Sequence, residues 1–240
     1  MYESEAMENW MHSWTLTIFW VFLCRYFDGW VLANKLTSKI DEWCVNHGLR
    51  HGQAYDLYKQ YGTALRGLRA EGYLENTPKA TDAYLQYVHD VGVQNHIKPD
   101  PELRKVLKAI DPTIPKYIFT ASVRQHAERC LKALGIEDLF VGIIDCKACD
   151  LETKHSHHAF RAAMRYARVK QPSKCLFFDD SVKNIRTARE MGWRAVLVGR
   201  IARDTREPIS SEDAELELDR IHDLPKVFPD LLADPDALRN

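Results

Sequence analysis

The sequence has no long apolar segment and almost no net charge, and each shortage argues against a class of protein. The apolar stretch from Trp14 to Cys24 is shorter than the roughly 20 residues of a membrane-spanning helix. A net charge of -1 over 240 residues indicates no basic surface for nucleic acid or for an anionic membrane. Residues 1–13 contain glutamate but no lysine or arginine, the wrong charge for the start of a signal peptide.

We therefore expect no nucleic-acid partner and no membrane partner. The expected location is the cytoplasm, with the nucleus as an additional site. A signal anchor formed by residues 14–24 is the alternative, and a buried first strand of the fold is the interpretation that we favour for the same residues.

The six cysteines are scattered, and their spacing does not predict a metal site. Cys146 and Cys149 form a single C-x-x-C pair, and no second pair is spaced to complete a zinc site. His157 and His158 are adjacent, so they point about 100° apart on a helix and cannot share a face. The remaining cysteines in apolar surroundings are interpreted as buried thiols in a reducing compartment: Cys24, Cys130 and Cys175.

What the sequence does contain is a regular alternation of apolar strands and amphipathic helices after Pro101. This alternation predicts an α/β fold with a doubly wound parallel sheet. We expect helices at 102–110, 122–134, 156–167 and around Ile185–Met191, and strands at 116–120, 140–144, 175–178 and 195–198. An edge strand near Leu216 and a terminal helix at 224–232 complete the prediction.

Residues 34–97 have a different pattern, with apolar side chains at helical spacing and no strand alternation. They predict a small all-helical cap inserted after the first strand. The α/β core is then expected to comprise residues 14–33 and 98–232, with an extension at 1–13 and a tail at 233–240.

The chemistry of the chain is most visible where a buried strand ends in two adjacent carboxylates, Asp179 and Asp180. The carboxyl ends of the strands are where open α/β sheets bind their ligands. Two neighbouring carboxylates repel each other unless a positive charge lies close by, and a hard cation such as Mg²⁺ takes oxygen ligands of this kind. The alternative is a loop in which Asp180 caps the next helix and Asp179 is solvated.

Three more polar residues follow other expected strands: Asp28, Thr120 and Lys154. A carboxylate can attack a phosphoryl group, and a divalent cation offsets the repulsion between that carboxylate and an anionic substrate. A lysine and a hydroxyl can hold the remaining phosphoryl oxygens. Taken singly, each residue has a structural explanation as a turn residue, a strand-end cap or a solvated charge.

In combination, these segments resemble the haloacid dehalogenase superfamily of hydrolases. The segments Tyr117–Thr120, Lys154 and Leu176–Ser181 resemble its second, third and fourth motifs. The segment Tyr58–Leu68 is similar to part of the cap in its pyrimidine 5′-nucleotidase-like branch. A Lys-Pro-Asp step at 98–100, the helical stretch 126–131 with its end at 134–136, and Asn184 extend the resemblance over roughly residues 27–232.

The first motif departs from the family pattern, which is Asp-x-Asp followed by a small polar residue. One register places the nucleophile on Asp28 and puts Trp30 where the family has its acid–base aspartate. A register shifted by two makes Asp28 that second aspartate and leaves Tyr26 at the nucleophile position. The tryptophan-rich start, residues 1–33, is either a divergent first motif or a gene-model error that replaces the first strand. The second motif departs too, with Ala121 where asparagine is usual.

The resemblance implies an Mg²⁺-dependent phosphohydrolase of small phosphomonoesters, with nucleoside 5′-monophosphates as the favoured substrates. Asp28, Thr120 and Lys154 would be the catalytic groups. Substrate would contact Thr120, Ala121, Lys154, Asn184 and Arg66, and the metal would be bound by Asp28, the backbone carbonyl of Trp30, Asp179 and Asp180. The alternative is an inactive member that binds a phosphate compound or a protein partner. A helical-cap dehalogenase fits less well, because the paired aspartates suit a metal.

Overall fold

The computed structural model describes residues 17–20, 29–202 and 207–234. Its centre is a six-stranded sheet in the order β3-β2-β1-β4-β5-β6, and every neighbouring pair is parallel. The strands are β1 (Thr17–Trp20), β2 (Lys116–Phe119), β3 (Gly142–Ile144), β4 (Cys175–Asp179), β5 (Arg194–Val198) and β6 (Leu216–Leu218). The prediction of an α/β fold with parallel strands is confirmed.

The strand order reverses between β1 and β4, which are neighbours in the middle of the sheet. In a doubly wound sheet, ligands bind at the carboxyl ends of the strands beside such a switch point. Asp179 is the last residue of β4, so the predicted acidic pair lies next to this position.

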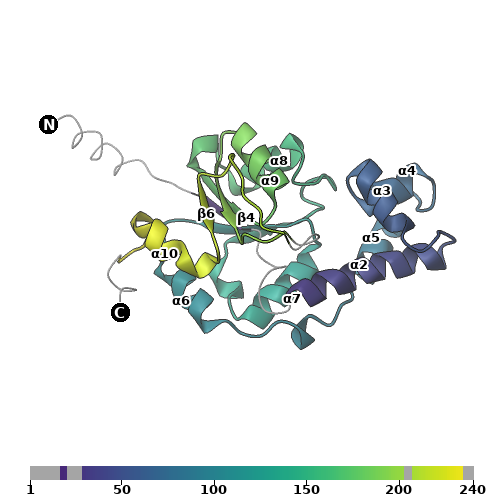
Figure 1. Cartoon of the computed structure of the whole chain (residues 1–240), viewed down its shortest axis with the longest axis horizontal. Helices are drawn as coiled ribbons and strands as arrows, with labels where there is room; N and C mark the ends of the chain where they lie inside the picture. The colour runs from purple at the N-terminus through teal and green to yellow at the C-terminus, as the bar shows by residue number, and fades with distance from the viewer. Residues whose placement is uncertain (1–16, 21–28, 203–206, 235–240) are drawn as a thin grey trace.

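Alternate residues of the strands enter two separate cores because side chains in a strand point to opposite faces. Leu176 and Phe178 of β4 lie in one core with α6 (Pro101–Ala109) and α7 (Arg124–Leu134), whereas Cys175 and Phe177 lie in the other with α8 (His157–Ala167) and α9 (Val182–Glu190). Figure 1 shows α8 and α9 on one side of the sheet and α6, α7 and α10 (Leu224–Val227) on the other. Helices therefore cover both faces.

The helices of the α/β part begin and end close to the predicted positions. Asp100 caps α6, where its carboxylate accepts from the Leu103 N–H at 2.8 Å, and the left-handed Gly135 ends α7. The bounds are α6 (Pro101–Ala109), α7 (Arg124–Leu134), α8 (His157–Ala167), α9 (Val182–Glu190) and α10 (Leu224–Val227). The single helix expected at 224–232 is wrong, because α10 ends at Val227 and a 3₁₀ turn follows at Pro229–Leu231.

Between β1 and α6 the described chain forms four α-helices that share a hydrophobic core. They are α2 (Gly29–Asn46), α3 (Gln53–Tyr61), α4 (Ala64–Ala70) and α5 (Pro78–Val88). Gly67 allows α3 and α4 to approach closely, since a Cβ there would lie 2.7 Å from Leu57 Cβ. Helix α2 runs across the expected boundary at residues 33 and 34, and the division into core and cap stays a prediction. We call α2–α5 the helical insertion.

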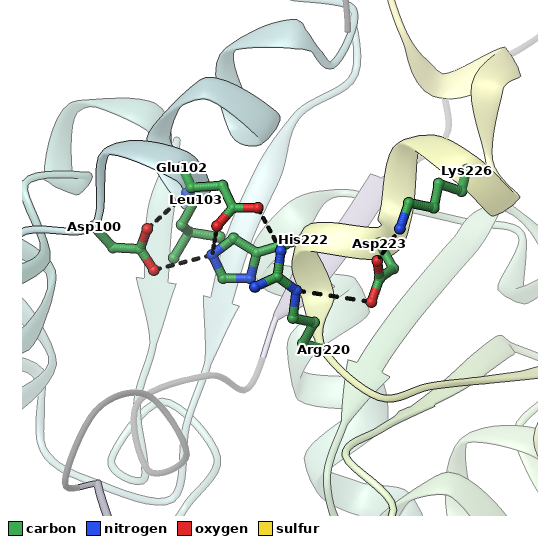
Figure 2. Close-up of polar contacts among 7 residues, drawn as sticks. All are labelled: Asp100, Glu102, Leu103, Arg220, His222, Asp223 and Lys226. Carbon is green, nitrogen blue, oxygen red and sulfur yellow. Dashed lines mark hydrogen bonds and ion pairs between the residues drawn. The ribbon is translucent and has the colours of Figure 1, made fainter. Parts of the chain in front are cut away.

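The C-terminal segment is attached to α6 by a buried polar contact (Figure 2). His222 Nε2 lies 3.1 Å from Asp100 Oδ2, and both side chains are almost fully buried. At the surface beside them, Arg220 pairs with Glu102. Asp100 also binds the Leu134 carbonyl through its N–H at the end of α7, so this contact joins three parts of the chain.

Other expectations from the sequence can be compared with the described residues. Among residues 17–20, 29–202 and 207–234, no helix is long and apolar enough to cross a membrane. Cys130 and Cys175 are buried free thiols, as predicted, and Cys146 and Cys149 are also free and buried; Cys24 lies outside the described residues. His157 and His158 form exposed ion pairs with Glu190 and Asp150, each at 2.8 Å.

Candidate active site

The most tightly held group of the site is the carboxylate of Asp179. Its Oδ2 accepts a hydrogen bond from Lys154 Nζ at 2.7 Å. Its Oδ1 accepts from the Ser181 N–H at 2.8 Å and from Asn184 Nδ2 at 3.0 Å. Asp179 is fully buried, and Lys154 is 7% exposed. The positive charge that the acidic pair requires is therefore supplied, at least in part, by the protein itself.

Asp180 and Asn184 provide further oxygen atoms near this carboxylate. Asp180 is half-buried at the end of β4. The Oδ1 atom of Asn184 is buried and accepts no hydrogen bond from the described part of the chain. Carboxylate and amide oxygens are the ligands that Mg²⁺ prefers, so these two residues fit such an ion. The described residues include no group of three or more His, Cys, Asp or Glu that could hold a metal.

Thr120 follows β2 on the other side of β1. Trp20 of β1 is level with Ile118 of β2 and with Phe178 of β4. Thr120 and Asp180 each lie two residues further on, one residue past the end of their strand, so both lie at the same edge of the sheet on either side of β1.

Lys154 lies over two aromatic rings of the sheet. Its Nζ is 5.8 Å from the centroid of the Phe119 ring and 5.9 Å from that of Phe177. Both rings belong to the core under α8 and α9. Because Phe119 directly precedes Thr120, this contact brings the ammonium group close to the end of β2 as well as to Asp179.

Positive charge gathers around this lysine. His155 is exposed, yet partial desolvation lowers the pKa of its imidazole below the usual range, and the charges of Lys183 and Lys154 lower it further. The charges of Lys154 and Lys183 therefore both act on the His155 imidazole.

The structure brings together some of the predicted site residues and not others. Lys154 and Asn184 both donate hydrogen bonds to Asp179, and Thr120 lies at the same edge of the sheet. Ala121 is exposed in the bend after Thr120. Arg66 is in an ion pair with Glu152, whose Oε2 is 3.0 Å from Arg66 Nη1.

Most of the first motif lies outside the residues that the structure describes. Asp28 and Tyr26 lie outside the described residues. Trp30 lies in the first turn of α2, but its side chain is outside the description.

Sequence reasoning missed two features of the site. The first is Asp145, which follows β3 just as Asp179 ends β4; it is buried and accepts from the N–H groups of Arg124 at 3.2 Å and Ala148 at 3.0 Å. A carboxylate at the end of an apolar strand was the signal that could have found it. The second is Ser181, the residue before α9, whose side chain makes no cap bond and whose backbone N–H binds Asp179 instead.

Solved structures of low sequence identity share the fold. CbbY from Rhodobacter sphaeroides, solved in complex with phosphate, has a TM-score of 0.62 at 16% identity, with 88% of this chain and 96% of that chain covered. YfnB from Bacillus subtilis, a HAD-hydrolase bound to magnesium, has a TM-score of 0.53 at 13% identity, with coverages of 90% and 99%.

A sequence relative is nearer. Phosphate metabolism protein 8 of Saccharomyces cerevisiae is 32% identical over 154 residues, which are 58% of this chain and 46% of the yeast protein. The chain thus spans about half the length of this relative. The haloacid dehalogenase-like hydrolase family matches residues 26–192, which is well over half of the chain and includes Thr120, Lys154, Asp179 and Asp180. The chain belongs to the haloacid dehalogenase-like hydrolases.

Proposed function

We propose that this protein is an Mg²⁺-dependent phosphohydrolase of small phosphomonoesters, with nucleoside 5′-monophosphates as the favoured substrates. The observation that carries the proposal is the buried Lys154–Asp179 pair, with Thr120 and Asp180 at the same edge of the sheet on either side of β1. An ammonium group and a hydroxyl on either side of one strand end suit the oxygens of a phosphoryl group.

Within this proposal the two aspartates have different roles. Both oxygens of Asp179 are already hydrogen-bonded, to Lys154, Ser181 and Asn184. Asp179 is therefore best suited to hold Lys154 in place, and Asp180 and the buried Asn184 Oδ1 would provide oxygen ligands to the metal. When bound, Mg²⁺ would offset negative charge between substrate and protein.

The nucleophile is proposed to be Asp28, which is the first carboxylate in the sequence after β1 and directly precedes α2. Trp30 would contribute only its backbone carbonyl to the metal. An indole has a single weak N–H donor, so it cannot replace the aspartate that protonates the leaving alcohol. The shifted register, with Tyr26 at the nucleophile position, remains the alternative.

The helical insertion is proposed to act as a cap that closes over the site and selects the leaving group. Its core includes Val123 and Cys146, which follow β2 and β3, and this contact supports the placement. Arg66 is available to an anionic substrate only if its ion pair with Glu152 opens.

The printed descriptions of relatives are consistent with phosphate chemistry. The yeast relative is named for phosphate metabolism, CbbY was solved with phosphate, and YfnB was solved with magnesium. The preference for nucleotides rests on the resemblance of Tyr58–Leu68 to the nucleotidase branch.

The position of Trp30 favours a second candidate, an inactive member that binds a phosphate compound or a protein partner. In a helix, the carbonyl of an early residue accepts from the N–H four residues later, which leaves it less free for a metal. An enzyme and an inactive member differ in turnover, so turnover is the decisive measurement.

The test is hydrolysis of nitrophenyl phosphate and of nucleoside 5′-monophosphates with Mg²⁺, by the unmodified chain and by Trp30→Asp and Lys154→Ala. The nitrophenolate leaving group needs no proton, so we expect slow turnover of that ester and very slow turnover of nucleotides. Restoring the acid should raise activity by about 10²–10⁴-fold, and Lys154→Ala should abolish it. If the unmodified chain and Trp30→Asp are both inert while phosphate still binds, the inactive member is the better account.

A further inference from the structure

The segment 145–154, which we call the Lys154 loop, is attached to two other parts of the protein. At its start, the Cys146 N–H donates to the Ser122 carbonyl at 3.1 Å, and Ser122 in turn donates its N–H to Thr120 Oγ1 at 3.1 Å. At its end, Lys154 binds Asp179. The loop thus runs from the loop that carries Thr120 to the buried carboxylate.

Two ion pairs tie the same loop to the helical insertion. Lys147 Nζ lies 2.6 Å from Asp82 Oδ1 of α5, and Glu152 Oε2 lies 3.0 Å from Arg66 Nη1 of α4. Their polarity is opposite, because the loop provides the cation of one pair and the anion of the other. A sliding of the insertion along the loop would therefore bring like charges together.

Apolar contacts lie between these two pairs. Cys146 is buried in the core of the insertion, and Leu151 packs against that core. Leu151 has φ 62° and its neighbour Asp150 has φ 55°. A left-handed backbone conformation is strained for a leucine. Strained conformations of this kind persist only where contacts with the surrounding structure enforce them. Here the packing of Leu151 and a 2.8 Å bond from its N–H to the Cys146 carbonyl hold the conformation.

We propose that Glu152 and Lys147 are positioning residues, and that the Lys154 loop couples the seating of the helical insertion to the placement of Lys154 against Asp179. Release of the insertion removes the support of Leu151, the loop relaxes, and Lys154 leaves its buried position. The phosphate-binding lysine is then in place only while the insertion is seated. The significance of this coupling for catalysis rests on the proposed phosphohydrolase function, but the coupling itself does not.

The two ion pairs are accessible to solvent, with exposed fractions of 45% and 58% for Lys147 and Asp82, and of 47% and 31% for Arg66 and Glu152. Exposed pairs are individually weak and are screened by salt. Breaking one of them should therefore change, by a small factor, the fraction of molecules in which the insertion is packed against the Lys154 loop, and it should leave the protein folded. This property makes the coupling measurable without loss of the fold.

The test is the rate at which an amine-acylating reagent modifies Lys154 in the full-length chain, measured by mass spectrometry with other lysines as internal references. Arg66→Glu should raise the rate about two- to fivefold. The double variant Arg66→Glu/Glu152→Arg should return it to the original value. The matched control is Lys59→Glu, which makes the same charge change on the insertion but breaks a pair with Asp56 within α3, so the rate should not change.

Hydrogen exchange of the peptide covering the Lys154 loop provides a second readout. Exchange should be faster in Arg66→Glu, return to the original rate in the double variant and stay unchanged in Lys59→Glu. Equal labelling of Lys154 in Arg66→Glu and Lys59→Glu would overturn the coupling, as would failure of the charge-swapped double variant to restore it. If the coupling is found but no phosphate ester is hydrolysed, the proposed function fails and the coupling stands. If esters are hydrolysed but labelling does not respond to Arg66, the coupling fails and the function stands.

Discussion

Removing the charge of Asp179 should destabilise the protein, although two adjacent carboxylates in a sequence suggest the opposite. Lys154 is 7% exposed and Asp179 is fully buried, with 2.7 Å between their charged atoms. Breaking a buried pair by removing one partner leaves an uncompensated charge and costs about 3–5 kcal/mol. In a protein of this size that cost lowers the melting temperature by roughly 6–20 °C. Asparagine is the substitution of choice, because its carbonyl oxygen can still accept from the Ser181 N–H.

The measurement is urea unfolding without divalent cations for Asp179→Asn, Lys154→Met and the double variant. Methionine at 154 retains contact with the aromatic rings below it. The double variant should therefore lose much less free energy of unfolding than the sum of the losses in the two single variants. The control is Glu215→Gln, which breaks an exposed pair with Arg194 at 2.6 Å and should cost less than about 1 kcal/mol. An unchanged or higher stability of Asp179→Asn, or strictly additive losses, would refute this account.

Three further predictions concern stability. Burial lowers the pKa of His126 to about 3, so as the pH falls this histidine is protonated in the unfolded chain before it is protonated in the folded protein. The free energy of unfolding should therefore fall by up to about 1.4 kcal/mol for each unit that the pH drops between about 6.5 and 3. His126→Phe should make this dependence less steep, as measured by urea unfolding at pH 7 and pH 5. Gly67→Ala should cost about 1–3 kcal/mol by overpacking against Leu57, seen as a lower urea midpoint; an unchanged midpoint would contradict the close packing of α3 and α4. Asp100→Ala should remove the cap of α6 and leave His222 without its buried acceptor, costing about 1–3 kcal/mol, with faster proteolysis near residue 222 as the second readout.

The α/β part of the fold could be predicted from the sequence because its signals are local. Apolar strands ending in polar residues, and Gly135 at the end of α7, specify elements within a few residues. The split of the last helix was missed, although Pro229 follows Phe228 and removes the N–H that a continuing helix requires.

The site could be predicted only in part, because hydrogen-bond partners depend on contacts between distant segments. The sequence indicated Asp179, Lys154 and Thr120 through their places after strands. It did not indicate that Lys154 would bind Asp179, nor that Arg66 would pair with Glu152, since 86 residues separate the latter two. Ser181 shows the same limit, because a residue at a helix start can act through its backbone as well as its side chain.

The central position of β1 has a consequence for synthesis on the ribosome. Thr17 pairs with Cys175, so the middle of the sheet cannot close until most of the chain has been made. At about 5–20 residues per second, β1 waits roughly 10–30 s for β4. The helical insertion has local contacts and can form during that interval. β1 can pair with β2 once residues 116–119 have been made, but its other edge stays unpaired until β4 emerges.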